Sequence, residues 1–322
     1  MPENKLKIAV AGAGAFGREH LGALARRDDV VIAGVADPNE AATRAAMADF
    51  GAAQSFADAV AMLDAVRPHG LIVATPGQTH VAIATAALAR DIPVLLEKPV
   101  GLNAADAEVL IAAEARSRAF VLPGHILRFS APYRRTVEIA RSGELGAILS
   151  VTGRNHRDDS HAVRYPDIDP VLMTMVHDID LTLWITGGEL QSVLALRRPR
   201  DSFRSETLIT GWDSAGAAWH ISNAWTVPTV EIPPDRVEIV CEAGSVEMEL
   251  GIAIRVYGRN PRVIDLRAEP ADDMLATELA TFLDGVRRGA HPGVVTLIDA
   301  RNGLRATDAI LRSLATGGLV AP

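Results

Sequence analysis

The chain has 322 residues, of which 48% are hydrophobic and 22% charged, as in a globular protein long enough for two domains. Its formal net charge of −8, with basic residues scattered along the chain, argues against a nucleic-acid partner. The uncharged stretch 71–89 is interrupted by proline, glycine and polar residues, so no membrane partner is expected either.

The cysteine content predicts a reducing compartment. Cys241 is the single cysteine of the chain, so no disulfide can form within it. The apolar N-terminal segment is rich in glycine and resembles a strand entering a loop more than a signal peptide. We therefore expect a cytoplasmic protein.

Short apolar segments alternate with helical segments over the first 122 residues. Strands are predicted at 6–12, 30–37, 70–76, 92–97 and 119–124, and helices at 15–27, 39–50, 79–90 and 103–117. These strands are apolar throughout, which is typical of a parallel sheet with helices on both faces. Residues 1–122 are therefore predicted to form an α/β domain around a doubly wound parallel sheet.

The pattern changes after about residue 123. Predicted next are a helix at 131–142, a strand at 147–156, a polar loop at 157–168 and a helix that begins at Asp169. Five β-like segments follow, at 190–198, 206–212, 216–225, 236–242 and 245–250, before helices at 273–288 and 296–316. Residues 123–322 are therefore predicted to be an α+β domain, with a large, mainly antiparallel open sheet and helices on one face.

The segment AVAGAGAFGREH (9–20) has the spacing GxGxxG between a predicted strand and a predicted helix. Gly12 permits a tight turn, Gly14 lets the backbone approach a pyrophosphate, and Gly17 lets the helix pack close to the strand. The helix N-terminus adds unpaired N–H groups and the positive end of a dipole. We therefore predict a dinucleotide site here, which includes Ala15 and Phe16.

Asp37 ends the next predicted strand, about 20 residues after Gly17. A carboxylate at this position accepts hydrogen bonds from the ribose hydroxyls of the adenosine and repels a 2′-phosphate. The expected cofactor is thus NAD in preference to NADP. Asp37 also precedes Pro38, and a role as a turn residue is compatible with ribose binding.

Two later strands end in ATPGQTH (74–80) and LLEKPVG (95–101). Ligands of open α/β sheets lie outside the carboxyl ends of the strands, which puts Thr75 and Pro76 beside the nicotinamide and Lys98 opposite it. A cationic ring and a dry site both lower the pKa of a lysine, so Lys98 is a candidate proton acceptor. The predicted cofactor-binding set also includes His80 and Glu97.

Together these motifs resemble the Gfo/Idh/MocA oxidoreductases, which include glucose–fructose oxidoreductase and inositol dehydrogenase. The resemblance rests on AGAGAFGREH, GVADPN, IVATPGQTH, LLEKPVGLN and HDIDLTLWITG, and it continues to the closing helices. It implies a Rossmann domain, a second domain that binds substrate, and hydride transfer between NAD(P) and a sugar, a polyol or a related alcohol. It also implies a homodimer or homotetramer that forms through the C-terminal sheet.

The resemblance assigns the catalytic pair as well. Lys98 matches the lysine of the family's EKP motif, its usual acid/base, and the Lys98–Pro99 peptide bond is expected to be cis. His177 matches the helix histidine that works beside this lysine. Many sugar-oxidising members have an aspartate four residues before that histidine, where this chain has Met173. Either another carboxylate serves, or the chemistry runs with Lys98 and His177 alone, or the substrate differs from a typical polyol. The thioether of Met173 would favour a less polar substrate surface.

His177 lies in DPVLMTMVHDIDLTLW (169–184), an otherwise apolar helical segment. Asp169 and Pro170 are typical of a helix start, and Gly187 is a natural stop. Helical spacing puts Met173, His177, Asp180 and Trp184 on one face, so Asp180 could orient the imidazole. A packed structural histidine is the alternative.

The loop RNHRDDSHAVRYPDID (154–169) is the densest polar stretch of the chain. In the family this region contacts substrate, so His156, Asp159 and Tyr165 are candidate substrate-binding residues, together with His125 and Arg128 from GHILRF (124–129). A solvated loop, or a contact that pins the two domains, would explain the same residues. Although His156, Asp159, His161 and His177 are of metal-ligating types, their spacing matches no compact metal motif, and no metal is predicted.

The sequence thus predicts an NAD-dependent dehydrogenase that acts on a carbinol carbon, with Lys98 as proton acceptor and His177 assisting. One alternative is a regulatory protein that senses a dinucleotide without turnover. Another keeps the enzyme class but changes the substrate to an imine, a dihydrodiol or an amino acid.

Overall fold

The computed structural model describes residues 5–228 and 231–322, which form two compact units. The first unit comprises the chain up to Ile126 together with Asp273–Arg301, and the second comprises Leu127–Asp272 and Asn302–Pro322. The predicted boundary after residue 122 lies close to the first crossing between the units. It does not foresee the return of Asp273–Arg301 to the first unit.

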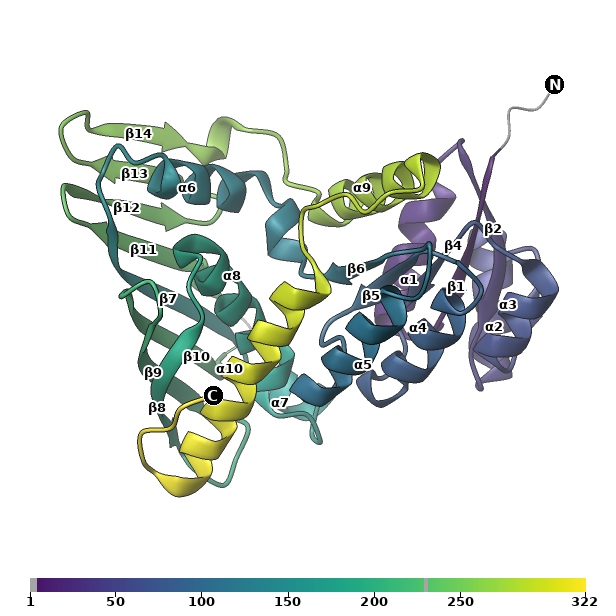
Figure 1. Cartoon of the computed structure of the whole chain (residues 1–322), viewed down its shortest axis with the longest axis horizontal. Helices are drawn as coiled ribbons and strands as arrows, with labels where there is room; N and C mark the ends of the chain where they lie inside the picture. The colour runs from purple at the N-terminus through teal and green to yellow at the C-terminus, as the bar shows by residue number, and fades with distance from the viewer. Residues whose placement is uncertain (1–4, 229–230) are drawn as a thin grey trace. The chain divides into compact units, whose positions relative to one another are not determined.

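A six-stranded parallel sheet forms the centre of the first unit (Figure 1), which confirms the predicted doubly wound fold. Its strand order is β3-β2-β1-β4-β5-β6. The strands are β1 (Leu6–Ala11), β2 (Val30–Ala36), β3 (Ser55–Phe56), β4 (Gly70–Val73), β5 (Val94–Glu97) and β6 (Val121–Gly124). The sequence prediction missed β3 because this edge strand has only two residues.

Helices cover both faces of this sheet (Figure 1). They are α1 (Ala15–Ala25), α2 (Glu40–Phe50), α3 (Ala59–Val66), α4 (His80–Leu88), α5 (Ala104–Glu114) and α9 (Met274–Arg288). Helix α1 packs against α2 and α9, whereas α4 packs against α3 and α5. The sequence prediction also missed the short helix α3.

Helix α9 joins the first unit through an apolar stripe. Leu279, Phe282 and Leu283 of α9 are buried. The ring of Phe282 meets Phe120 edge to face, at 6.0 Å between centroids, and it also covers Gly70 at the start of β4. These contacts explain why a segment so late in the sequence belongs to the N-terminal sheet.

An eight-stranded sheet forms the centre of the second unit, in the order β14-β13-β12-β11-β7-β10-β9-β8. Its strands are β7 (Ile148–Asp158), β8 (Leu190–Arg198), β9 (Glu206–Asp213), β10 (Ala218–Val227), β11 (Arg236–Cys241), β12 (Gly244–Glu249), β13 (Ala253–Tyr257) and β14 (Arg262–Asp265). Only β7 and β10 pair in parallel. The predicted, mainly antiparallel sheet is confirmed, although β13 and β14 were not foreseen.

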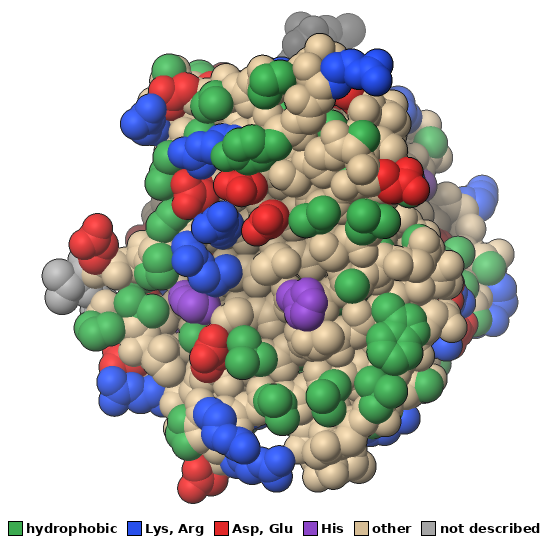
Figure 2. All heavy atoms as spheres, turned by 90° about the vertical axis from the view of Figure 1, so that its left-hand side faces the viewer, with side chains coloured by type: hydrophobic (Ala, Val, Ile, Leu, Met, Phe, Trp, Pro, Cys, Tyr) green, Lys and Arg blue, Asp and Glu red, His purple; other side chains and the backbone are tan. Residues whose placement is uncertain are grey.

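One face of this second sheet is covered by helices α6 (Ala131–Arg141), α8 (Val176–Thr186) and the part of α10 (Leu297–Thr316) from Asn302 onward (Figure 1). Ile179 of α8 and Ile310 of α10 pack there with Trp219 and Ile221 of β10. The other face carries alternate residues of the same strands, as expected of an antiparallel sheet with one face free of helices. Figure 2 shows apolar, charged and histidine side chains mixed on that side.

None of the helices in the described ranges is long and apolar enough to cross a membrane.

Candidate functional site

The glycine loop between β1 and α1 has the geometry that each of its three glycines was predicted to provide. Gly12 has φ +99°, and a Cβ built on it would lie 2.4 Å from the carbonyl oxygen of Ala74. A Cβ on Gly17 would lie 2.0 Å from the carbonyl oxygen of Gly12. A Cβ on Gly14 would meet nothing within 4 Å. The loop is therefore tight against the sheet at Gly12 and Gly17 and open at Gly14.

The open position at Gly14 fits a pyrophosphate. Gly14 is the N-cap of α1, and no side chain caps the helix there or adds an acidic group to its first turn. The helix therefore presents free backbone N–H groups and its positive dipole end to the space beside Gly14. Ala15 and Phe16 open the helix, and the Phe16 side chain is 40% exposed.

Asp37, the residue after β2, hydrogen-bonds to the backbone of the glycine loop. Its Oδ2 accepts the backbone N–H of Ala13 at 2.8 Å, and its Oδ1 accepts that of Asn39 at 2.8 Å. The carboxylate thus holds the glycine loop and starts the following turn, as the Asp-Pro pattern indicates. A carboxylate oxygen still has a second lone pair for a ribose hydroxyl, and ribose binding by Asp37 stays a prediction.

The loop after β4 contains Thr75 and Pro76. His80 connects this loop to the loop after β5. The buried His80 side chain bridges the two loops, because Nε2 lies 2.7 Å from the carbonyl oxygen of Thr75 and Nδ1 lies 2.8 Å from that of Pro99. Burial lowers the pKa of His80. The ring of His80 thus sets the spacing of the two strand ends, and direct contact between these residues and a cofactor stays a prediction.

Lys98 follows β5 at the same edge of the sheet, and its peptide bond to Pro99 is cis, as predicted. Its Nζ lies 5.8 Å from the ring centroid of Phe16, within the range of a cation–π interaction. Burial lowers the pKa of Lys98, and the charge of Glu97 opposes this shift. A lowered pKa is compatible with a proton acceptor, and the catalytic role of Lys98 stays a prediction.

His177 lies in the first turn of α8, directly after a π-helical turn at Val171–Met175. The wider turn alters the spacing that would have put Met173 directly on the His177 face, and such turns occur often at functional sites. Gly187 ends the helix in the left-handed conformation, as predicted. A catalytic role for His177 stays a prediction.

Asp180 is held by Arg128 in a buried, bidentate ion pair. Nε of Arg128 lies 3.0 Å from Oδ2 of Asp180, and its second terminal nitrogen lies 2.8 Å from Oδ1. The guanidinium also lies 5.5 Å from the ring centroid of Trp184. Asp180 was predicted to orient His177, and Arg128 was predicted to bind substrate. Their ion pair holds α8 in place. Their further roles stay predictions.

Sequence reasoning missed a buried polar cluster between α8 and its sheet. The Thr174 hydroxyl donates to Oδ1 of Asn223 and accepts from Nε1 of Trp225, both at 3.0 Å. Burial raises the pKa of Asp178 well above its ordinary range, although the neighbouring Asn155 and Asn223 act in the opposite direction. Asn155 and Asn223 could have been found from strand alternation, since both occupy inward positions of β7 and β10.

The predicted substrate loop is divided between two faces. His156 points away from α8: its Nε2 contacts the Ser222 hydroxyl at 2.8 Å, and Ser222 also contacts Glu206. These side chains occupy outward positions of β7, β10 and β9. The structure therefore does not bring His156 to the face that carries His177.

The rest of this loop forms a short helix, α7 (Ser160–Arg164). Asp159 pairs with Arg204 at 2.8 Å. His161 and Tyr165 pack with the ring of Trp225, at centroid distances of 5.7 and 6.5 Å. Tyr165 thus joins the aromatic wall next to the Thr174 cluster, on the α8 side of the sheet. His125 is buried at the end of β6 in the first unit.

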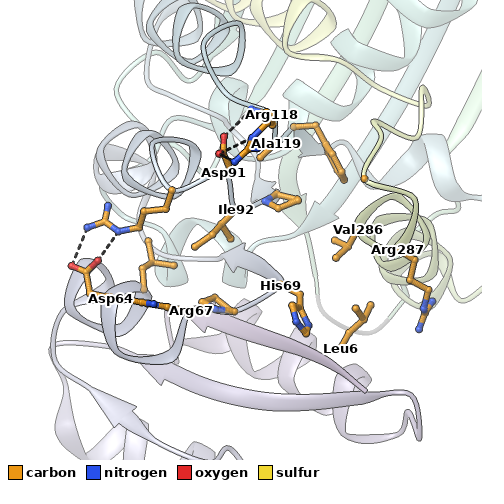
Figure 3. Close-up of a pocket in the computed structure, with 16 residues that line it drawn as sticks. Leu6, Asp64, Arg67, His69, Asp91, Ile92, Arg118, Ala119, Val286 and Arg287 are labelled. Carbon is orange, nitrogen blue, oxygen red and sulfur yellow. Dashed lines mark hydrogen bonds and ion pairs between the residues drawn. The ribbon is translucent and has the colours of Figure 1, made fainter. Parts of the chain in front are cut away.

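A hollow of about 870 Å³ in the first unit lies away from the glycine loop and Lys98 (Figure 3). Its lining includes Leu6, His69, Ile92 and Phe120, all at or just before the starts of parallel strands. It is therefore at the amino end of the sheet, opposite the glycine loop. Arg118 at its rim pairs with Asp91 (Figure 3), and Arg90 pairs with Asp64.

The sequence matches two protein families. An oxidoreductase family with an NAD-binding Rossmann fold matches residues 6–125, and the GFO/IDH/MocA C-terminal domain matches residues 133–247. An inositol 2-dehydrogenase from Streptomyces avermitilis is 30% identical, with the similarity covering 94% of this chain and 92% of that protein.

Solved structures share the fold over nearly the full length. Myo-inositol 2-dehydrogenase from Lactobacillus plantarum gives a TM-score of 0.85 at 19% identity, covering 99% of each chain. Levoglucosan dehydrogenase, in complex with NADH and levoglucosan, gives a TM-score of 0.84 at 18% identity, again covering 99% of each chain.

The glycine loop generates a paired prediction. Gly17→Ala should destabilise the protein by several kcal/mol, since its new methyl overlaps a backbone oxygen that cannot move freely. Gly14→Ala should cost less than about 1 kcal/mol in stability but weaken NADH binding about tenfold or more, because its methyl enters the open space. Thermal melting and NADH fluorescence titration measure the two effects. Full-strength NADH binding by a folded Gly14→Ala protein would contradict the assignment.

Proposed function

The chain belongs to the Gfo/Idh/MocA family of NAD-dependent oxidoreductases, and on this premise we propose that it transfers a hydride between nicotinamide and a carbinol carbon of a sugar, polyol or related alcohol. The observation that carries the proposal is Lys98, which stands at the ligand edge of the Rossmann sheet with a lowered pKa. The inositol and levoglucosan dehydrogenases among its relatives support a substrate with several hydroxyl groups.

NAD, when bound, supplies the nicotinamide that accepts or returns the hydride. The backbone at Gly14 and the N-terminus of α1 would hold its pyrophosphate, and Asp37 would accept hydrogen bonds from its adenosine ribose. The fixed spacing of the Thr75 and Pro99 loops, set by His80, would support the nicotinamide end.

Lys98 acts as the proton acceptor for the substrate hydroxyl. Only three of the chain's 32 basic residues are lysines, namely Lys5, Lys7 and Lys98. In a protein that otherwise uses arginine, a lysine at the ligand edge of the sheet supports a role that arginine cannot fill, because a guanidinium does not give up its proton. As the carbinol carbon loses its hydride, the neutral amine of Lys98 takes the hydroxyl proton, and in the reverse direction it returns that proton.

His177 assists by hydrogen-bonding the substrate oxygen. The thioether of Met173 cannot act as a base, so the carboxylate that many family members place there has no direct replacement at that position. We infer that the second unit recognises the substrate through Tyr165. The hydrogen bonds of Thr174 with Asn223 and Trp225 support the helical segment that carries His177. This arrangement favours a substrate that is less polar on one side than inositol.

The same family premise supports an oligomer through the second sheet. Its outward positions expose large apolar side chains, among them Leu208 at 45%, Trp212 at 47% and Val263 at 66%. We propose that this face binds a second copy of the chain. Sedimentation should give a dimer or tetramer, and Trp212→Glu should shift it toward the monomer; a monomeric wild-type protein would remove the proposal.

We also propose that the protein acts in the cytoplasm. Cys241 is buried as a free thiol, which a reducing compartment preserves.

The function is tested directly with a substrate panel. Sugars, inositols, other polyols and dihydrodiols are supplied with NAD or NADP, and NADH formation is followed by absorbance. We expect turnover with at least one polyhydroxylated substrate and a preference for NAD, because Asp37 repels a 2′-phosphate. Binding of NADH without turnover on any substrate would instead favour the regulatory alternative.

The role of Lys98 predicts a specific loss. Lys98→Arg keeps the positive charge but cannot release a proton, so turnover should fall about 10²–10⁴-fold while NADH binding changes little. Lys7→Arg, at an exposed position, is the matched control and should behave as wild type. Turnover of Lys98→Arg within a few-fold of wild type would eliminate the proton-acceptor role.

A further inference from the structure

Three buried titratable side chains from distant parts of the sequence converge in the first unit. His20 comes from α1, Glu97 from the end of β5, and Glu278 from α9. One nitrogen or oxygen atom of each lies within 4.8 Å of the others. His20 and Glu278 are 0% exposed and Glu97 is 6% exposed, so their charges are shielded by protein rather than by water.

Glu97 links this cluster to Lys98. Its Oε1 lies 2.7 Å from Nε2 of His20, and its Oε2 accepts the backbone N–H of Lys98 at 3.2 Å. An ionised carboxylate only accepts hydrogen bonds, so Nε2 of His20 is the donor. Nδ1 of His20 is buried with no hydrogen-bond partner among the described residues.

Glu278 is a buried acid without an ordinary partner. Neither of its carboxyl oxygens accepts a hydrogen bond from the residues that the structure describes. An ionised carboxylate is costly in such a place, above all next to a second carboxylate. Burial raises the pKa of Glu278 well above its ordinary 4.5, and the charge of Glu97 adds to the shift. Both effects favour the protonated form of Glu278.

We propose that Glu278 is a positioning residue for the reaction: as a neutral acid it donates its proton toward Glu97, and so keeps Glu97 ionised as the fixed negative charge beside Lys98. The proposal rests on the proposed role of Lys98 as proton acceptor. One atom of each residue lies within 4.8 Å of the others, a separation that one bridging water spans. Glu278 would thus act on Lys98 only through Glu97.

The residues around Glu97 leave room for its carboxylate as the negative charge that acts on Lys98. A Cβ on Gly124 of β6 would lie 3.3 Å from Oε2 of Glu97, so a glycine leaves room for this carboxylate. The titratable groups that face or follow the cluster come from α1, α4, α9 and the ends of β5 and β6: His20, His80, Glu278, Glu97, Lys98 and His125. Among them Glu97 is the group whose charge raises the pKa of Lys98 against the effect of burial.

A metal ion is the competing occupant of this cluster. Ligands of a tetrahedral zinc ion at about 2.0–2.2 Å lie roughly 3.3–3.5 Å from one another. The 2.7 Å separation of His20 Nε2 and Glu97 Oε1 is instead a hydrogen-bond distance. The geometry therefore favours a shared proton over a shared metal.

Infrared spectroscopy tests the protonation state without any substrate. The difference spectrum between wild type and Glu278→Gln at neutral pH should contain the carbonyl band of one neutral carboxylic acid, lost in the variant. Metal analysis of the purified wild-type protein should show no stoichiometric metal. A carboxylate band in place of the acid band, or one bound metal per chain that Glu278→Gln removes, would overturn the proposal.

The positioning role is tested by the pH profile of kcat/KM for alcohol oxidation. This value rises with pH as Lys98 loses its proton, so the midpoint of the acid limb reports on Lys98. Glu97→Gln removes the negative charge and should move the limb to lower pH. Glu278→Leu removes the donor, so Glu97 carries its charge less readily and the limb should move the same way. Glu278→Gln retains a donor and should keep the limb of wild type.

The outcomes separate this proposal from the proposed function. If Lys98→Arg retains turnover, the function of Lys98 fails, but the infrared result still decides the state of Glu278. If Lys98→Arg is inactive and Glu278→Gln shifts the limb as far as Glu278→Leu, the function stands and the positioning role fails. Should Glu278→Leu not fold, the comparison of wild type, Glu97→Gln and Glu278→Gln decides alone.

Discussion

The burial of the Glu97 carboxylate beside Lys98 is the constraint on which the chemistry of the first unit depends. A buried amine prefers to be neutral, whereas a neighbouring carboxylate favours its charged form. Both effects act on Lys98, and burial is the larger. In the role proposed for Lys98, a lowered pKa lets the amine both accept and return a proton, as a reversible dehydrogenase requires. Burial without Glu97 would favour the neutral amine further, and exposure would leave it charged.

The rest of the first unit fixes this pair in place. Gly124 leaves space for the carboxylate, His20 forms a hydrogen bond with it, and the ring of His80 connects the loop at Pro99 to the loop after β4. The glycine loop, open only at Gly14, lies at the same edge of the sheet. The second unit is built differently: α8 is fastened to its own unit by the Arg128–Asp180 pair and by the polar cluster around Thr174.

The sequence predicted those features that depend on neighbours in the chain. Gly12, Gly14, Gly17 and Asp37 follow a fixed spacing, so their geometry could be derived from local turn and helix requirements. Side-chain partners were harder to predict. Helical spacing suggested Asp180 as a partner for His177, but it could not show that Arg128, from a distant segment, pairs with the same carboxylate. The prediction for His156 did not apply the alternation of the strand predicted at 147–156, which puts its side chain on the face opposite that of Asn155. Glu278 did leave a signal: it occupies the apolar stripe of α9, four residues before Phe282, where a charged residue needs an explanation.

The central claim is that Lys98 is held with a lowered pKa at the ligand edge of the sheet, and it can be tested by NMR without a substrate. The chain has three lysines, so protein labelled with ¹³C at the lysine ε-carbon gives three signals, and Lys98→Arg assigns that of Lys98. We predict that Lys98 titrates below the ordinary lysine value of 10.5, below the exposed Lys5 and Lys7, and lower still in Glu97→Gln. A Lys98 signal that titrates together with those of Lys5 and Lys7 would contradict the account.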